Sequence, residues 1–114
     1  TPGGSMPTSL SRAAGISLTK AMSKDFAADN ILVNTICIGL IKSGQNRRRW
    51  EAEHEKDPSL TLDAWYTDRG NNLPLGRVGE AREAGDLICF LASERASYIT
   101  GTAINVDGGS APVV

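Results

Sequence analysis

The chain has 114 residues, of which 12 are lysine or arginine and 13 are aspartate or glutamate, so its formal net charge is −1. This balance argues against a nucleic-acid-binding protein, because surfaces that follow phosphates need a clear basic excess. Apolar residues make up 40% of the chain and aromatic residues 5%, a composition typical of a soluble α/β domain and unlike that of a disordered segment.

The chain shows no sign of a membrane segment or a signal peptide. Its longest apolar run, residues 36–41, is too short to cross a bilayer, and residues 1–8 lack the basic and apolar stretches of a leader. Cys37 and Cys89 lie in apolar segments, so we expect two small buried side chains, no disulfide and a reducing, cytoplasmic setting. A single histidine, with no CxxC or HExxH motif, leaves little material for a metal site.

A helix is predicted to begin near Pro7 and Thr8 and to end at Asp29-Asn30. Its small apolar residues cover more than one stripe, which favours a helix packed on two sides. The β-branched run over residues 31–38 predicts a buried parallel strand. Gly39 follows at the carboxyl end of this strand, where open α/β sheets bind their ligands.

Residues 42–72 predict two short helices that are broken at Asp57-Pro58. The three arginines at 47–49 are interpreted as a solvated helical face, neutralised by acids three to four residues away, in preference to a phosphate site. Trp50, Trp65 and Tyr66 are expected to pack this segment onto the sheet rather than to stack on a ligand. A 30-residue insertion after a strand is long for a simple connection, so a lid over a site is a second interpretation.

A third helix is predicted after the loop at 74–80, because Ala84, Leu87, Ile88 and Leu91 share one helical face. A short strand follows over residues 102–106 and stops at Asp107-Gly108-Gly109. The predicted order is therefore helix, strand, lid helices, helix and strand. Two parallel strands do not make a stable sheet, so the chain is expected to be one end of a larger domain.

Several separate blocks of the sequence resemble the carboxyl-terminal half of the short-chain dehydrogenase/reductases. The matching blocks are Ser11-Arg12-Ala13-Ala14-Gly15-Ile16-Ser17-Leu18-Thr19-Lys20-Ala21, Ile31-Leu32-Val33-Asn34, Pro74-Leu75-Gly76-Arg77-Val78-Gly79-Glu80, Phe90-Leu91-Ala92-Ser93, Tyr98-Ile99-Thr100-Gly101 and Val106-Asp107-Gly108-Gly109.

The resemblance implies an α/β fold in which residues 1–114 form the C-terminal part of a single Rossmann-type, doubly wound parallel sheet, with a lid-like helical insertion at about 42–72. It also implies NAD or NADP as cofactor, a small-molecule carbonyl or alcohol substrate, and a homo-oligomer or the missing N-terminal half as partner. Nucleic acid and membrane are not expected as partners.

The family's catalytic Tyr-x-x-x-Lys motif falls on the first helix, where it aligns with Thr8 and Arg12. In the family the tyrosine exchanges the proton and the lysine binds the ribose and lowers the tyrosine pKa. Arg12 still offers a positive charge to a ribose, whereas the Thr8 hydroxyl has no suitable pKa for proton transfer. The chain alone is therefore expected to be inactive.

After the first strand the family commonly carries Pro-Gly and, four positions after the glycine, a threonine that contacts the cofactor. This chain has Ile38-Gly39, then Ile41 and Ser43, so we assign these residues together with Arg12 as cofactor-binding candidates. From the residues alone, a turn glycine and a helix N-cap serine are equally good interpretations of Gly39 and Ser43.

Asn34 lies in an apolar run, and its amide is expected to hold a neighbouring loop by hydrogen bonds. The functional alternative to an oxidoreductase is a scaffold or regulatory protein of the same fold that has lost the Tyr/Lys dyad.

Overall fold

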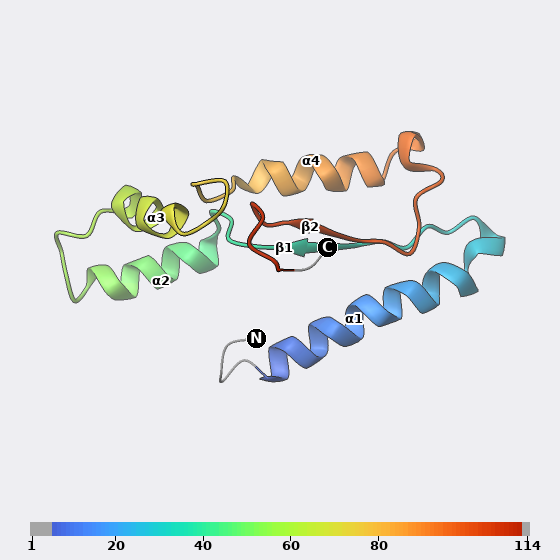
Figure 1. The fold of residues 1–114 in the computed structure, drawn as a ribbon, viewed down its shortest axis with the longest axis horizontal. Coiled ribbons are helices and arrows are strands. Elements are labelled where there is room, and N and C mark those ends of the chain that lie inside the picture. Colours follow the sequence, from blue (N-terminus) through green and yellow to red (C-terminus); the bar gives the residue numbers. More distant parts are fainter. Residues whose placement is uncertain (1–5, 113–114) are drawn as a thin grey trace. The chain divides into compact units, whose positions relative to one another are not determined.

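The computed structural model describes residues 6–112. In chain order the elements are α1 (Met6–Asp25), the 3-10 helix η1 (Ala27–Asp29), β1 (Thr35–Ile38), α2 (Gly44–His54), α3 (Leu62–Asn71), α4 (Ala81–Leu91), the 3-10 helix η2 (Glu94–Ala96) and β2 (Ala103–Val106) (Figure 1). The predicted order of elements is thus confirmed. Within residues 6–112, no helix is both long enough and apolar enough to cross a membrane.

The two strands pair side by side in a parallel, two-stranded sheet (Figure 1). The Thr35 N–H donates to the Thr102 carbonyl at 2.9 Å, and the Gly39 N–H donates to the Val106 carbonyl at 3.0 Å. Because the residue number rises by four on both strands between these bonds, the strands run in the same direction.

The first strand is shorter and more exposed than expected. Strand pairing starts at Thr35, since the preceding Val33 bonds a loop instead: its N–H donates to Thr100 Oγ1 and its carbonyl accepts from the Gly101 N–H. Ile31 and Ile38 are 48% and 51% exposed, so the expectation of a fully buried strand is wrong for the described chain. Parallel strands are normally buried by further layers on both faces, and the sheet described within residues 6–112 has two strands.

The described residues divide into two compact units. The first unit contains the residues up to Ile36 together with Ile88–Ile104. In it, the Thr19 and Thr35 hydroxyls are hydrogen-bonded, which ties α1 to the start of β1. Gly101 adopts φ +69°, and a side chain there would meet Ser23 on α1, so a glycine is required at this position.

Helix α1 ends earlier than predicted and buries little. It stops at Asp25, and the chain tightens into η1 before Asn30 takes a left-handed conformation (φ 57°) and donates to the Ala27 carbonyl. The buried residues of α1 are Thr19 and Ser23, whereas Leu10 and Leu18 are 71% and 58% exposed. Packing of this helix on two sides is therefore not seen within the described chain.

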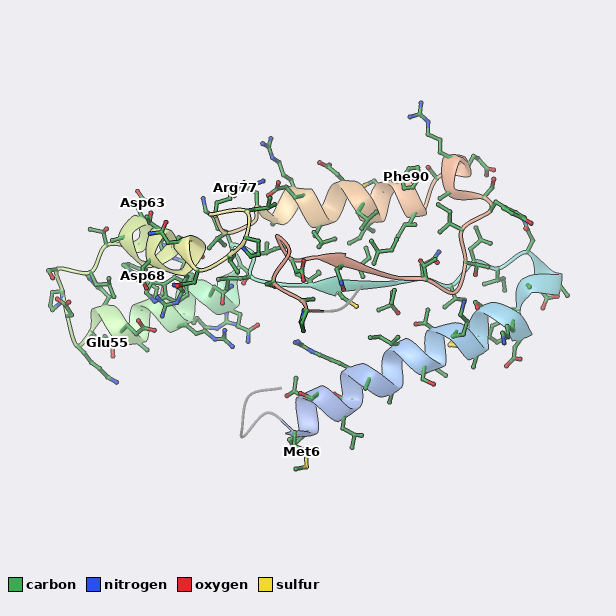
Figure 2. All side chains as sticks on the ribbon, viewed as in Figure 1. Met6, Glu55, Asp63, Asp68, Arg77 and Phe90 are labelled. Carbon is green, nitrogen blue, oxygen red and sulfur yellow. The ribbon has the colours of Figure 1, made fainter. Side chains whose placement is uncertain are left out.

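Exposed apolar side chains also occur at other positions. Met6 on α1 and Phe90 on α4 are 77% and 40% exposed (Figure 2). Cys37 is half-buried and Cys89 is exposed, and both thiols are free. The expectation of a buried side chain was wrong for Cys89, which lies on an exposed part of α4, whereas Ala84 of the same helix is buried.

Asn34 holds the loop before β2, as expected. Its Nδ2 donates to the Ile99 carbonyl at 2.8 Å, and its Oδ1 accepts from the Thr102 N–H and hydroxyl. Both the Nδ2 and the Oδ1 of the half-buried amide are therefore hydrogen-bonded, and the side chain fixes the start of β2 beside β1.

The second unit contains Cys37–Leu87 together with the described residues from Asn105 onward. Its core is formed by Trp65, Tyr66 and Val78, against which pack Leu40, Trp50, Leu60 and Leu62. Helices α2 and α3 are separated at Asp57-Pro58 as predicted, and Asp57 Oδ1 accepts from both the N–H and the hydroxyl of Ser59. The aromatic residues mainly pack these helices against each other, which differs from the expected docking onto the sheet.

Candidate functional site

The turn that follows β1 is shaped by a close approach between Gly39 and Asp107. A Cβ atom on Gly39 would lie 2.5 Å from the Asp107 Cβ and 2.6 Å from its Cα. Asp107 is itself fixed, because its carboxylate accepts from the N–H groups of Gly109 and Ala111. These hydrogen bonds hold the Asp107 pKa below its usual value. Gly39 thus has a structural role, as the turn interpretation predicted.

The helical excursion from residue 42 to residue 78 is closed at its base by a parallel bridge between Ile41 and Gly79. The Lys42 N–H donates to the Gly79 carbonyl at 2.8 Å, and the Gly79 N–H donates to the Leu40 carbonyl at 3.1 Å. Lys42 also forms a 2.6 Å ion pair with Glu80, which raises the lysine pKa. Entry to and exit from the excursion are therefore held together.

Ser43 begins α2 as its N-cap, and its hydroxyl accepts from the Asn46 N–H. Asn46 is buried, and its Nδ2 donates to the Ile41 carbonyl at 2.7 Å. Asn46 was not predicted from the sequence, because its partner, the Ile41 carbonyl, is fixed by the path of the chain and not by a capping pattern. Together these two residues fix the path of the chain from β1 into α2.

The turn leaves two backbone donors available. The Gly39 N–H is bound to β2, the carbonyls of Leu40 and Ile41 accept from Gly79 and Asn46, and the Lys42 N–H is bound to Gly79. Across residues 6–112, no hydrogen-bond partner is found for the N–H groups of Leu40 and Ile41. They lie just beyond the carboxyl end of a parallel strand, where α/β proteins bind ligands.

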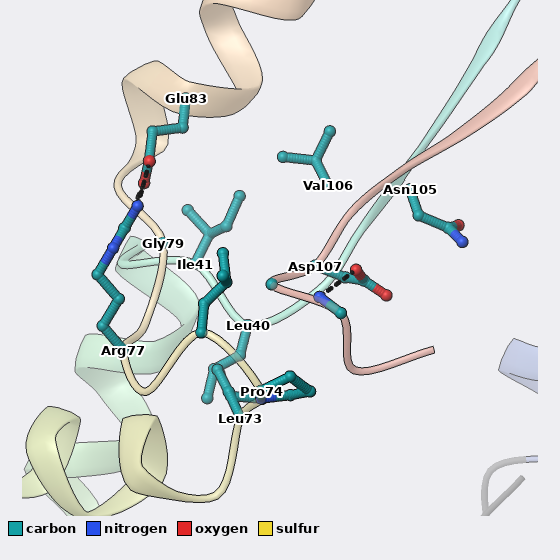
Figure 3. Close-up of a pocket in the computed structure, with 13 residues that line it drawn as sticks. Leu40, Ile41, Leu73, Pro74, Arg77, Gly79, Glu83, Asn105, Val106 and Asp107 are labelled. Carbon is teal, nitrogen blue, oxygen red and sulfur yellow. Dashed lines mark hydrogen bonds and ion pairs between the residues drawn. The ribbon is translucent and has the colours of Figure 1, made fainter. Parts of the chain in front are cut away.

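A cavity of about 400 Å³ opens beside this turn (Figure 3). Its apolar wall comes from the end of β1, from the loop before α4 and from the end of β2, and includes Leu40, Ile41, Pro74, Leu75 and Val106. Its polar lining includes Arg77, Glu83, Asn105 and Asp107. The cavity therefore suits a small and largely apolar group.

The ion pair at the edge of this cavity is strongly fixed. Arg77 donates to both carboxylate oxygens of Glu83 at 2.7 and 2.8 Å, and the Glu80 N–H donates to Glu83 Oε2 at 2.7 Å. Arg77 and this N–H lower the Glu83 pKa to about 2. This pair was not predicted from the sequence, although Glu83 stands three residues after Glu80 at the start of a predicted helix, the spacing of a capping box.

Thr8 and Arg12 lie one turn apart on α1, and both are exposed. The Thr8 carbonyl accepts from the Ser11 hydroxyl at 3.0 Å, and no partner of the Arg12 guanidinium is found among residues 6–112. The pair therefore has the helical spacing that the dyad needs, with different chemical groups.

The three arginines of α2 behave differently from one another. Arg47 pairs with Glu51 at 3.4 Å, as expected for neutralisation by an acid four residues away. Arg49 instead donates to Asn46 Oδ1 at 3.3 Å and has no ion pair with Glu53, so the expectation is wrong for Arg49. Arg48 has no acidic partner within the described part of the chain.

Known proteins resemble the chain along most of its length. The family model described as enoyl-(acyl carrier protein) reductase matches residues 2–111. Oxidoreductase UcpA from Salmonella typhimurium is 37% identical over 101 residues, which cover 89% of this chain and 37% of that protein. Human dehydrogenase/reductase SDR family member 4 is 36% identical over 107 residues, which cover 94% of this chain and 35% of that protein.

The fold of the chain is also similar to that of a solved structure. The short chain oxidoreductase from Pseudomonas aeruginosa PAO1, described as containing an atypical catalytic center, superimposes in its apo form with a TM-score of 0.82 at 40% identity, covering 94% of this chain and 41% of that chain. The same protein has an NADPH-bound structure, with a TM-score of 0.79. The chain therefore spans less than half the length of the relatives it matches.

The partial parallel sheet is accordingly part of a Rossmann-type fold. On the strength of the family-model match along nearly its whole length, the chain belongs to the short-chain dehydrogenase/reductase family.

Proposed function

We propose that this chain is the C-terminal portion of an NAD- or NADP-dependent oxidoreductase that interconverts carbonyl and alcohol groups, and that it is inactive alone. The observation that carries the proposal is the turn after β1, where the unpaired N–H groups of Leu40 and Ile41 face no partner in the described chain. Amide donors in this place suit the carboxamide or phosphate oxygens of a dinucleotide.

The family pattern gives two separate sets of cofactor candidates: Ile38, Gly39, Ile41 and Ser43 around this turn, and Arg12 on α1, whose positive charge would suit a ribose. A nicotinamide cofactor supplies or accepts the hydride when bound. The residues of this chain bind and orient it through backbone donors. NADPH bound to the Pseudomonas aeruginosa relative supports a nicotinamide cofactor without selecting between NAD and NADP.

Loss of activity in the isolated chain follows from two features. Thr8 stands where the family has its proton-exchanging tyrosine, and a threonine hydroxyl does not ionise near neutral pH. The residues also span less than half of the relatives' length, so the strands and the phosphate loop of the other half would have to come from elsewhere.

The exposed apolar side chains support a partner that covers them. Leu10, Leu18, Ile38 and Ile88 are each more than half exposed, which is unusual for residues of helices and strands in a folded domain. We propose that a second copy or the N-terminal half packs against these faces. The two free thiols suit a reducing, cytoplasmic setting.

The test is a titration with NADH and NADPH, followed by nicotinamide fluorescence. We expect no micromolar affinity for the chain alone, and micromolar affinity after it is joined to the N-terminal half of UcpA. Micromolar affinity of the unjoined chain would overturn the idea that its site is partial. Native mass spectrometry gives an independent result, because a stable monomer would contradict the proposed partner.

A non-catalytic scaffold is the second candidate, and the Thr8 and Arg12 substitutions favour it. The double change Thr8→Tyr and Arg12→Lys in the joined protein separates the two candidates. If the substituted dyad is what limits catalysis, restoring it raises carbonyl reduction well above the starting rate. An already high turnover that the double change leaves unaltered would remove the reason for the scaffold hypothesis.

A further inference from the structure

A second cavity, of about 480 Å³, lies between helices α2 and α3. Its charged lining consists of three cations, Arg49, Lys56 and Arg69, and one acid, Glu53. The other acids of this region that Figure 2 labels, Glu55, Asp63 and Asp68, do not line it. The cavity therefore has an excess of positive charge, although the chain as a whole has none.

The acid in the cavity is already fully engaged. Arg69 Nη2 lies 2.9 and 3.2 Å from the two carboxylate oxygens of Glu53, and Trp65 Nε1 donates to Glu53 Oε2 at 3.0 Å. The Arg69 guanidinium carbon also lies 3.6 Å from the centre of the Trp65 ring. Since Trp65 is only 2% exposed, these contacts form a rigid floor of the cavity, in which the charges of Glu53 and Arg69 cancel.

The two remaining cations have no acidic partner within the described chain. Arg49 stands four residues before Glu53, the spacing that normally gives a helical ion pair, yet Glu53 bonds to Arg69 instead. Arg49 is held by Asn46, which is anchored in turn to the Ile41 carbonyl. Lys56 lines the same cavity from the turn that follows α2, two residues after the helix ends at His54.

Helix stability does not account for Arg49. The first turn of α2 contains no acidic residue, and arginines occupy positions 47–49 in its N-terminal half. The helix dipole acts mainly on the first and last turns, so it gives no stabilisation to Arg49 in the middle of α2, whereas Lys56 lies beyond the C-terminal end, where a cation is favoured. An anion beside Arg49 and Lys56 would compensate both cations.

We propose that the α2–α3 cavity binds the carboxylate or phosphate group of a small molecule. Its volume lies within the range of small-ligand sites. Arg49 and Lys56 would supply the charge-assisted hydrogen bonds, and Trp65 with Arg69 would supply the floor. The proposal goes beyond the oxidoreductase function and does not depend on it, because every residue involved lies within the excursion.

The experiment titrates the chain with inorganic phosphate and, separately, with succinate, replacing chloride to hold the ionic strength constant. Tryptophan fluorescence is the readout, since both tryptophans, Trp50 and Trp65, lie in the excursion. We expect a saturable change with at least one anion. Saturation by phosphate alone or by succinate alone identifies the group that the cavity prefers, and the absence of saturation with both overturns the proposal.

Matched variants show where binding occurs. Arg49→Gln and Lys56→Gln should each weaken binding about two- to five-fold, the range of exposed charge pairs. Arg48→Gln removes the same charge from the same helix but does not line the cavity, so it should leave the affinity unchanged. Equal weakening by all three variants would indicate diffuse attraction to the helix and would overturn the proposal. Because these side chains are exposed, circular dichroism should show an unaltered fold.

Discussion

Replacing Gly39 by alanine tests the packing between the two strand ends. The added Cβ would lie 2.5 Å from the Asp107 Cβ and 2.6 Å from its Cα. Non-bonded carbon atoms are at their optimum about 3.5–4.0 Å apart, so both contacts overlap by about 1 Å. One partner is backbone, which a rotamer change cannot move aside.

The overlap must be relieved by shifting the backbone at residue 39 or 107. Overpacking of this kind typically costs about 1–3 kcal/mol. Movement of Asp107 would also disturb the hydrogen bonds that it accepts from Gly109 and Ala111, which adds to the loss. We therefore expect Gly39→Ala to lower the free energy of unfolding by about 2 kcal/mol or more.

Urea unfolding, followed by circular dichroism at fixed protein concentration, measures this effect without any cofactor. Gly85→Ala is the matched control, because Gly85 lies within α4 and a Cβ there would meet no atom within 4 Å. Alanine is the better helix former, so the control should gain about 0.5–1 kcal/mol. If Gly39→Ala proves as stable as the unmodified chain while the control behaves as expected, the close-approach argument is refuted.

Three further predictions concern other parts of the chain. The lowered pKa of Glu83 stabilises the folded chain above about pH 4.5, and this stabilisation is lost as the pH falls toward 2, so Glu83→Gln should flatten that part of a stability-versus-pH curve. Trp65→Ala should cost about 3–5 kcal/mol in urea unfolding because it empties the core of the excursion, and Trp65→Phe should cost less. Asn34→Ala should cost about 1–3 kcal/mol and, in hydrogen exchange, should speed exchange of the Thr102 amide, whereas unchanged protection would show that this side chain does not hold the loop.

The sequence predicted best those elements whose signals are local. The apolar face of Ala84, Leu87, Ile88 and Leu91 marks α4, and Asp57-Pro58 marks the break between α2 and α3. The prediction that Asn34 binds a neighbouring loop was correct, because an amide in an apolar segment is costly unless it forms hydrogen bonds.

Exposure was predicted less well, because it depends on neighbours that this chain does not supply. A β-branched run such as residues 31–38 indicates what the sheet of a whole domain would bury, whereas here Ile38 remains 51% exposed. Cys89 follows the same reasoning, since it and the neighbouring Ile88 remain exposed on α4.

Some residues of the two candidate sites were likewise predicted from the sequence, and others were not. Gly39 and Ser43 were found because the family pattern marks them, and the structure gives each of them a structural role. The pairing of Glu53 with Arg69 was not predictable, because it joins residues 16 apart on two helices and displaces the local pair with Arg49. Spacing along one helix does not show which of two basic side chains an acidic residue will bind in the folded chain.

The bridge between Ile41 and Gly79 holds the two ends of the helical excursion together, so the helices between them can be replaced as one unit. Its two ends emerge from adjacent points, so a stretch of different length or sequence can be spliced in without altering the register of β1 and β2. The helical excursion can therefore vary while the strands keep their pairing, and a protein engineer can use the same two positions to exchange it.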